Sequence, residues 1–245
     1  MKISDNCFAV TGLYYTDPWS VNAGFAAGDA ITAVIDSGSN TASAQTIYGY
    51  AKSVRPDNQM ILINTERHLD HIGGNGYFFG NGVCIYGHSA IKRTQDEFIA
   101  LLQDINDGIN DEERKENNEG CIAFKNTRIV NPDRMLDNDA EFDLGGISIQ
   151  ILMTPGHTKS NLSVYQKDER VLFCGDCIAA DFMPNLGEGN PDDWKIWLTS
   201  LEKIRKLNPG IIVPGHGNVI IGKTEIDREI SRISDIIYHA INTLK

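Results

Sequence analysis

Short apolar runs alternate along the chain with longer segments whose apolar residues recur every three or four positions. The short runs have the length and composition of β-strands, and they cover 8–15, 31–36, 60–65, 83–86, 147–153, 162–165, 171–174 and 211–213. The longer segments have the period of helices, and they cover 42–54, 90–105, 192–207 and a last stretch that starts near Thr224. Strands interleaved with helices predict an α/β fold with a mixed sheet.

Two of the predicted helices have well-defined apolar stripes. The helix over 192–207 ends at Asn208-Pro209-Gly210, and its stripe contains Trp194, Trp197, Leu198, Leu201, Ile204 and Leu207. In the last helix Thr224 and Asp227 have the spacing of a capping box, and one face contains Ile226, Ile230, Ile233, Ile237 and Ala240. We expect both stripes to pack in the core.

The chain is expected to form one domain over residues 1–245. Its 245 residues exceed the roughly 150 of an average domain, yet no Pro-, Ser- or Gly-rich linker divides the sequence. An acidic helix–loop insertion near 100–140 stands apart, because residues 104–119 contain seven acidic and two basic residues. Charge runs are usually solvated, so we expect a solvated insertion there; the alternative is a lid over a pocket.

The net charge of the chain limits the classes of partner that it is expected to bind. The 33 Asp and Glu residues against 22 Lys and Arg residues leave a net charge of −11. Such a field repels nucleic acid and anionic membranes unless a basic patch is concentrated on one face, and no Lys/Arg run is long enough to form one. A small-molecule substrate is therefore expected, with no nucleic-acid or membrane partner. The choice between a monomer and a homodimer stays open.

The N-terminus and the cysteines predict a cytoplasmic protein. The first 15 residues lack the cationic and apolar segments of a signal peptide, and no apolar run approaches the roughly 18 residues of a membrane span. The five cysteines are scattered and odd in number, unlike those of a disulfide framework. We expect Cys174 and Cys177 to be buried and structural.

Four segments share a form that predicts a metal site. In each, an apolar run ends in a turn where Gly or Pro accompanies residues that can bind metals. These residues are Glu66, His68, Asp70 and His71 in the first segment, His157 in the second, Asp176 in the third and His216 in the fourth. A lone histidine on an apolar segment is usually a core residue, but four segments of one form favour a metal site.

The residue types in this set indicate the chemistry. Imidazole and carboxylate are ligands for zinc, iron or manganese. Four imidazoles and three carboxylates suffice for two adjacent metals, which lie about 3.5–4 Å apart in two-metal sites. A hydroxide held between the metals would be the nucleophile, because metal binding lowers the pKa of water toward about 7. The metals would also polarise a carbonyl or phosphoryl oxygen.

The four segments also resemble a known family. The run Thr65-Glu66-Arg67-His68-Leu69-Asp70-His71 resembles the Thr-His-x-His-x-Asp-His motif of the metallo-β-lactamase superfamily, and Gly73-Gly74-Asn75 follows it as in that family. The other three segments resemble the family's later motifs in the same order, and residues 22–38 resemble its opening hairpin. The resemblance implies a four-layer αβ/βα sandwich, in which two mixed β-sheets are flanked by helices and a dinuclear metal cleft lies along one edge.

The resemblance also implies roles for single residues. Two divalent metal ions would be held by a shared set of ligands: Glu66, His68 and His157 for one, Asp70, His71 and His216 for the other, and Asp176 between them. Asp70 would in addition orient the attacking water. Asp36 matches a position whose carboxylate supports the first motif from behind.

Glu66 departs from the family motif, which has histidine at this position. With three carboxylates, two divalent metals and one hydroxide, the site has no net charge, whereas the usual two carboxylates leave +1. The change weakens the electrophile and shifts the metal preference toward iron or manganese; zinc remains the first expectation. Flavodiiron proteins are similar in having a glutamate within this motif, at the following histidine. The alternative is that Glu66 turns away to Arg67 or Lys159 and leaves one metal.

The remaining polar and aromatic candidates are weaker. His88 and His239 lie outside the motifs and are expected to be structural or exposed. The aromatic residues Tyr14, Tyr15 and Trp19 fall where the family has a wall of its substrate groove, so they predict either an apolar wall or ordinary hairpin packing. Asn161 matches an asparagine of the lactamases, but Ala179 replaces their substrate-binding lysine, which argues against a true β-lactamase.

The leading functional prediction is a dinuclear hydrolase that acts on an ester, thioester, lactone or related acyl bond. Glyoxalase II resembles the chain in its motifs, so a thioester is one option among several. The alternatives are a di-iron oxidoreductase of flavodiiron-like type, a phosphodiesterase or nuclease, and a metal-binding protein without turnover. The acidic charge disfavours the phosphodiesterase.

Overall fold

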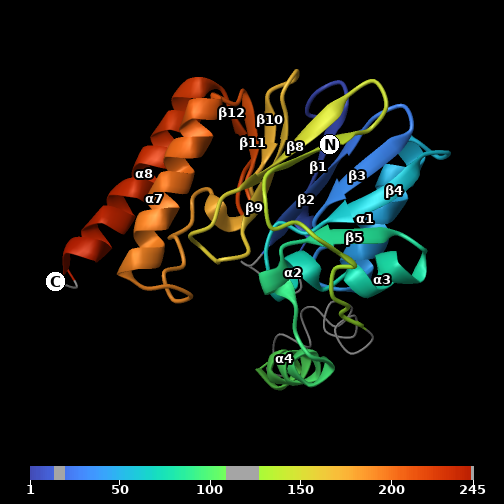
Figure 1. Cartoon of the computed structure of the whole chain (residues 1–245), viewed down its shortest axis with the longest axis horizontal. Helices are drawn as coiled ribbons and strands as arrows, with labels where there is room; N and C mark the ends of the chain where they lie inside the picture. Colours follow the sequence, from blue (N-terminus) through green and yellow to red (C-terminus); the bar gives the residue numbers. More distant parts are fainter. Residues whose placement is uncertain (14–19, 109–126, 244–245) are drawn as a thin grey trace.

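Two six-stranded sheets form the centre of the computed structural model, which describes residues 1–13, 20–108 and 127–243 (Figure 1). The first sheet has the spatial order β1 (Cys7–Leu13), β2 (Val21–Ala27), β3 (Ile31–Ile35), β4 (Gln59–Ile63), β5 (Cys84–Gly87) and β6 (Arg134–Met135). The second has the order β12 (Ile220–Ile221), β11 (Ile211–Val213), β10 (Val171–Phe173), β9 (Leu162–Gln166), β8 (Ser148–Met153) and β7 (Ala140–Asp143).

Both sheets are mixed, as the sequence predicts. In the first sheet, β1, β2 and β3 pair antiparallel, whereas β3, β4, β5 and β6 pair parallel. In the second sheet only β10 and β11 are parallel. Parallel neighbours have their carboxyl ends at one edge of the sheet, so the turns that follow β4 and β5, or β10 and β11, open at a common edge.

Helices cover the outer faces of the two sheets. The helices are α1 (Thr41–Val54), α2 (Leu69–Ile72), α3 (Asn75–Gly80), α4 (Gln95–Gly108), α7 (Pro191–Leu207) and α8 (Lys223–Thr243), with short 3₁₀ turns η1 (Ser89–Ile91) and η2 (Gly175–Cys177). Helices α7 and α8 pack on the second sheet, and α1 and α3 pack on the first (Figure 1). The result is the αβ/βα sandwich that the resemblance implied.

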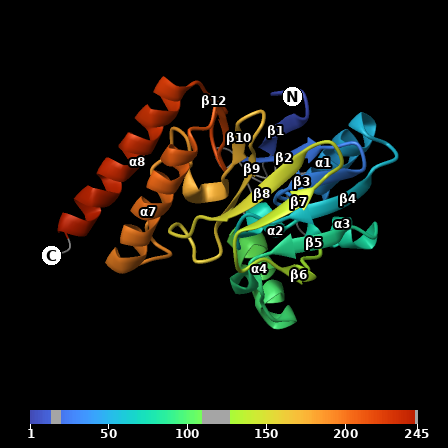
Figure 2. The same cartoon turned by 45° about the horizontal axis from the view of Figure 1, so that its top comes forward.

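Four apolar clusters hold the structure together, and one of them packs α1 and α3 on the first sheet. Ile35 and Ile63 of the first sheet meet Val164 and Phe173 of the second between the sheets. The predicted stripe of α7 packs against the second sheet together with α8, and Trp197 is almost fully buried there. A smaller cluster joins α2 to α4, which both views show at the lower edge of the molecule (Figures 1 and 2).

The prediction of a helix over 90–105 is wrong for the first part of that range. The structure has η1 over Ser89–Ile91, and α4 begins only at Gln95. Thr94 and Glu97 form a reciprocal capping pair: Glu97 accepts a hydrogen bond from the Thr94 backbone at 2.6 Å, and its own backbone N–H donates to the Thr94 hydroxyl at 3.2 Å. Such a pair marks a helix start, so the chain breaks before Thr94.

Other boundaries also differ from the prediction. Helix α8 begins at Lys223, so Thr224 lies inside it, and Asp227 binds the Lys223 ammonium at 2.5 Å. The strand β2 is absent from the predicted strands, because its sequence VNAGFAA is rich in alanine and glycine and buried at every position, without alternation. Tyr14, Tyr15, Trp19 and residues 109–126 of the acidic insertion fall outside the described residues.

No helix in the described ranges is long and apolar enough to cross a membrane.

Truncation of Trp197 is predicted to destabilise the fold. Its ring lies in the core between α7 and the second sheet, and its Nε1 donates a hydrogen bond to the Cys177 carbonyl at 3.0 Å. We expect Trp197→Ala to lower the free energy of unfolding by about 3–5 kcal/mol, measured by urea denaturation. Ile196→Ala is the matched control on the same helix, where the side chain is 47% exposed; it is expected to change stability by less than about 0.5 kcal/mol. Equal unfolding midpoints for the two variants would contradict this assignment of the core.

Candidate metal centre

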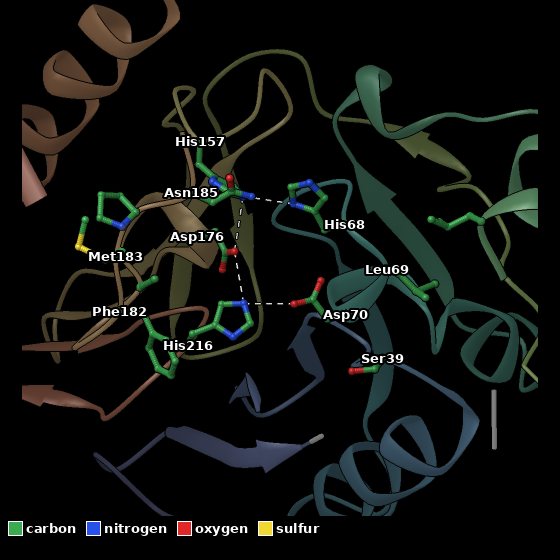
Figure 3. A pocket seen from close by; sticks show the side chains of 13 residues that line it. Ser39, His68, Leu69, Asp70, His157, Asp176, Phe182, Met183, Asn185 and His216 are labelled. Atoms are coloured by element: carbon green, nitrogen blue, oxygen red, sulfur yellow. Dashed lines mark hydrogen bonds and ion pairs between the residues drawn. The ribbon is translucent and has the colours of Figure 1, made fainter. Parts of the chain in front are cut away.

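Seven side chains converge where strands of both sheets end. They come from the turns after β4, β8, β10 and β11, and Figure 3 shows five of them facing one another across a cavity. Their ligand atoms lie within 4.8 Å of one another in each of two groups: Glu66, His68, His157 and Asp176 in the first, and Asp70, His71 and His216 in the second. These are the seven residues that the sequence motifs single out.

Asp176 contacts imidazoles of both groups. Its Oδ2 lies 3.5 Å from His157 Nε2 and 3.3 Å from His216 Nε2. Its Oδ1 lies 3.2 Å from His71 Nε2. The carboxylate is therefore positioned between the two groups.

Glu66 faces the centre and not the solvent. It is fully buried, and its Oε1 lies 2.8 Å from His68 Nδ1 and 3.5 Å from His71 Nε2. The backbone N–H of His68 also donates to this oxygen at 3.1 Å. Glu66 thus points into the centre, and it does not turn away to Arg67 or Lys159.

Unpaired buried atoms in the centre fit a bound cation. Glu66 Oε2 is buried without a hydrogen-bond partner among the described residues. His71 Nε2 and Asp176 Oδ1 are also buried without a hydrogen bond, and they face each other at 3.2 Å as an ion pair. Leaving such an atom unsatisfied costs about 1–3 kcal/mol, and buried polar atoms are normally paired. Imidazole nitrogen and carboxylate oxygen are donor atoms for zinc, iron and manganese. The donor set is therefore consistent with a dinuclear metal site.

Opposite charges stabilise one another in the centre. Burial alone would lower the pKa of His216, but the carboxylates of Asp176 and Asp70 raise it to about 11. Burial would likewise lower the pKa of His68, but the Glu66 carboxylate has the larger effect and raises this pKa to about 9. Burial alone would raise the pKa of Asp70, whereas His71 and His216 lower it to about 2. The carboxylates are therefore ionised at neutral pH.

Asp36 supports the first motif from behind, as the resemblance implied. Its carboxylate accepts hydrogen bonds from the Thr65 backbone N–H at 2.7 Å and from the Thr65 hydroxyl at 2.6 Å. Its Oδ2 also lies 2.9 Å from His71 Nδ1. With Nδ1 engaged in this way, Nε2 of His71 points into the centre. Asp36 itself has a positive φ of 61°, an uncommon backbone conformation held by these contacts.

The His216 turn is held by the opening hairpin. The Asn22 side-chain amide donates to the carbonyl oxygens of Pro214 at 3.0 Å and Gly217 at 2.8 Å, and His216 Nδ1 lies 2.8 Å from the Ser20 carbonyl oxygen. A Cβ at Gly215 would lie 1.9 Å from Asp176 Oδ1. Only glycine lets this turn approach the carboxylate so closely, which explains why Gly precedes the histidine.

The ligand cluster forms one wall of a cavity of about 580 Å³ (Figure 3). His68, Asp70, His157, Asp176 and His216 all line it. A volume of about 300–1,000 Å³ is typical of small-molecule sites. The metal ligands are therefore accessible to a small molecule from one side.

Glu188 is a site residue that the motifs did not reveal. Its Oε1 lies 3.4 Å from His68 Nε2, on the side of the ring away from Glu66. A carboxylate on the second nitrogen of a ligating histidine orients the ring and raises its basicity. Glu188 lies in Gly187-Glu188-Gly189, far along the chain from the first motif, so no spacing connects it to His68.

Other candidate residues have structural positions. Asn161 is buried and donates to the Thr154 hydroxyl and the Cys174 carbonyl, so it joins strand ends and does not line the cavity. Cys174 and Cys177 are free buried thiols, as predicted. Ala179 does line the cavity. His88 Nδ1 accepts a hydrogen bond from Ala90, and His239 is exposed on α8; both lie outside the centre.

Comparison with known proteins agrees with this geometry. The family model "Metallo-beta-lactamase superfamily" matches residues 16–216. The "Beta-lactamase-like protein 2 homolog" of Drosophila melanogaster is 42% identical over 121 residues, which cover 43% of this chain and 39% of that protein. The "Hydroxyacylglutathione hydrolase" of Methylococcus capsulatus is 38% identical over 146 residues, 60% of this chain and 43% of that protein. The matched segments thus span less than half the length of both relatives.

A solved structure shares the whole fold. The "Metallo-beta-lactamase from Pontibacter korlensis" superposes with a TM-score of 0.71 over 96% of this chain and 98% of its own, at 18% identity. This superposition shows the shared fold, and the family match shows that the chain belongs to the metallo-β-lactamase superfamily.

Metal binding is predicted to release protons. In the metal-free protein at pH 7, His68 and His216 are protonated because their pKa values are about 9 and about 11, and His71 is protonated because Asp36, Asp70 and Asp176 outweigh burial and hold its pKa well above the ordinary value. A metal binds only the neutral imidazole, so about three protons must leave at pH 7, and the apparent affinity should rise as the pH increases toward about 9 and beyond. Zinc titration by calorimetry in buffers of different ionisation enthalpy measures the release. Binding without proton release, at an affinity independent of pH, would contradict the charge pairing described above.

Replacing Glu188 is predicted to weaken metal binding. Glu188→Gln removes the charge that faces His68 Nε2, and loss of such a partner typically costs about 10–100-fold in metal affinity. The control is Glu202→Gln, which removes the same charge from the exposed surface of α7. Competition against a chromophoric chelator gives both affinities. Equal affinities would show that Glu188 does not orient the histidine.

Proposed function

We propose that this chain is a dinuclear metal-dependent hydrolase of an ester, thioester, lactone or related acyl bond in a small molecule. The observation that supports this most directly is the exposure of the ligand cluster on one wall of the 580 Å³ cavity. A small molecule in the cavity can therefore contact the ligand residues that line it, which are His68, Asp70, His157, Asp176 and His216. The similarity to a hydroxyacylglutathione hydrolase supports acyl, and in particular thioester, chemistry.

The seven residues of the two groups would hold the metals, and Asp176 would lie between them. Zinc is the metal we expect first, with iron or manganese as alternatives because Glu66 adds a hard carboxylate ligand. Two divalent ions bound there would supply a hydroxide nucleophile at neutral pH and polarise the scissile carbonyl. The reaction needs no serine or cysteine nucleophile.

Asp70 would orient the attacking water. Its side chain lines the cavity, its Oδ2 lies 3.1 Å from His216 Nε2, and its pKa of about 2 keeps it ionised. An ionised carboxylate accepts a hydrogen bond from water and directs the oxygen lone pair at the acyl carbon. In the hydrolysis, the water oxygen bonds to that carbon, the bond to the leaving group breaks, and the leaving group takes a proton from the water.

The proposal predicts a metal content and a substrate preference. Protein purified anaerobically without chelator is expected to contain about two metals per chain by elemental mass spectrometry. The loaded protein is expected to hydrolyse p-nitrophenyl acetate in preference to bis-p-nitrophenyl phosphate. Asp70→Asn should lower kcat on the ester by about 10²–10⁴-fold, whereas Asp137→Asn, at an acidic residue near His88, should not change it.

Each contrary result points to another function. A preference for the phosphodiester would indicate a phosphodiesterase. Two irons with oxygen or nitric oxide consumption would indicate a di-iron oxidoreductase. One metal or none, with no turnover, would indicate a metal-binding protein without catalytic activity.

A further inference from the structure

Outside the ligand cluster, the cavity has apolar walls. Leu69 of α2 and Leu101 of α4 line one side, and Phe182 and Met183 of the segment between η2 and α7 line another. Met183 is 72% exposed, so a large apolar side chain stands open at the cavity. Figure 3 shows Phe182 and Met183 on the same side as His216, and the Phe182 ring centroid lies 6.2 Å from that of His216. Apolar surface therefore continues up to the candidate metal ligands.

The described lining contains no lysine or arginine. Ala179 occupies one of its positions, and the polar residues apart from the cluster are Ser39 and Asn185, both uncharged. The Ser39 hydroxyl is buried and has no hydrogen-bond partner within the described chain, so it can bind a neutral polar group. A carboxylate placed on these walls would lose hydration without gaining a counter-ion, which is costly.

When two divalent metals are bound, the centre has no net positive charge that would attract an anion and offset its loss of hydration. The three carboxylates of Glu66, Asp70 and Asp176 carry −3, two divalent metals carry +4 and one hydroxide carries −1, so the sum is zero. Glu188 adds a negative charge beside His68, and the nearby Arg93 guanidinium, which interacts with both Glu66 and Glu188, offsets it. The whole chain has a net charge of −11, so its long-range field also repels anions.

The apolar wall is anchored to the C-terminal helix. Arg232 of α8 donates to the backbone carbonyl oxygens of Phe182 at 2.7 Å and Ala179 at 3.3 Å. Its guanidinium is paired with Glu229 at 2.6 Å, and Glu229 also accepts the Asp181 backbone N–H at 3.3 Å. Because the backbone of this segment is fixed, the wall is preorganised for binding and needs little ordering when a ligand arrives.

We propose that the substrate carries an uncharged hydrocarbon group next to its scissile acyl bond, and that Leu69, Leu101, Phe182 and Met183 bind this group. The inference rests on the proposed acyl hydrolase function and specifies its substrate class. It excludes substrates whose acyl group ends in a carboxylate.

Two matched esters test the proposal directly. The monoester of adipic acid with p-nitrophenol differs from p-nitrophenyl hexanoate only by a terminal carboxylate in place of the terminal methyl. We expect kcat/KM for the hexanoate to exceed that for the adipate by about tenfold or more. Along the series acetate, butyrate, hexanoate, kcat/KM should rise by up to about fourfold per methylene, which corresponds to about 0.8 kcal/mol.

Substitution at Met183 should largely abolish the preference. Met183→Lys places a cation on the wall at an exposed position, so the fold should tolerate it. The hexanoate-to-adipate ratio is expected to fall by about tenfold, because the new ammonium pairs with the adipate carboxylate. Tyr238→Lys is the control, since it adds the same charge at an exposed position of α8 and should leave the ratio unchanged.

A binding measurement separates failure of this inference from failure of the hydrolase proposal. 2-Octanone and 7-oxooctanoate are non-hydrolysable ketones that differ in the same way as the two esters, and calorimetry on the metal-loaded protein gives their affinities. Turnover of both esters at equal rates would overturn the inference and leave the hydrolase intact. Tighter binding of 2-octanone without turnover of any ester would refute the hydrolase and retain the apolar site. Equal affinity for the two ketones would overturn the inference whether or not the esters are hydrolysed.

Discussion

The structure depends on pairing buried carboxylates with imidazoles where the two sheets meet. Glu66, Asp70 and Asp176 are each surrounded by histidines, and without those partners their burial would cost several kcal/mol per charge. Because the partners come from turns of both sheets, the charge pairing also joins the sheets at one end. The same requirement explains the tight turns, since a Cβ at Gly215 would displace Asp176.

Glu66 adds a negative charge to this arrangement. Its carboxylate oxygen faces the imidazoles of His68 and His71. The extra charge raises the pKa of His68 to about 9. It also removes the net positive charge that a centre with two carboxylates would keep when loaded with metal. A centre of this kind attracts anions less, so binding must come from other parts of the cavity.

The apolar walls provide that binding surface. Folds of this class support many reactions, because the chemistry depends on the site and the specificity depends on the surrounding loops. Here the specificity elements are the start of α2, the middle of α4 and the segment that contains Phe182 and Met183. Arg232 couples this last segment to α8, so the C-terminal helix takes part in shaping the cavity although it contributes no lining residue.

Local sequence determined the strand ends, the order of the ligand motifs and the stripe of α7, because each depends on neighbours in the chain. The reciprocal pair of Thr94 and Glu97 is local too, and their spacing could have placed the start of α4. Tertiary structure alone decided that Glu66 faces the centre, that Glu188 meets His68, and that the walls beside the ligands are apolar. These features arise from contacts between segments far apart in the sequence. The periodicity and spacing of residues within one segment do not determine which distant side chain packs against that segment.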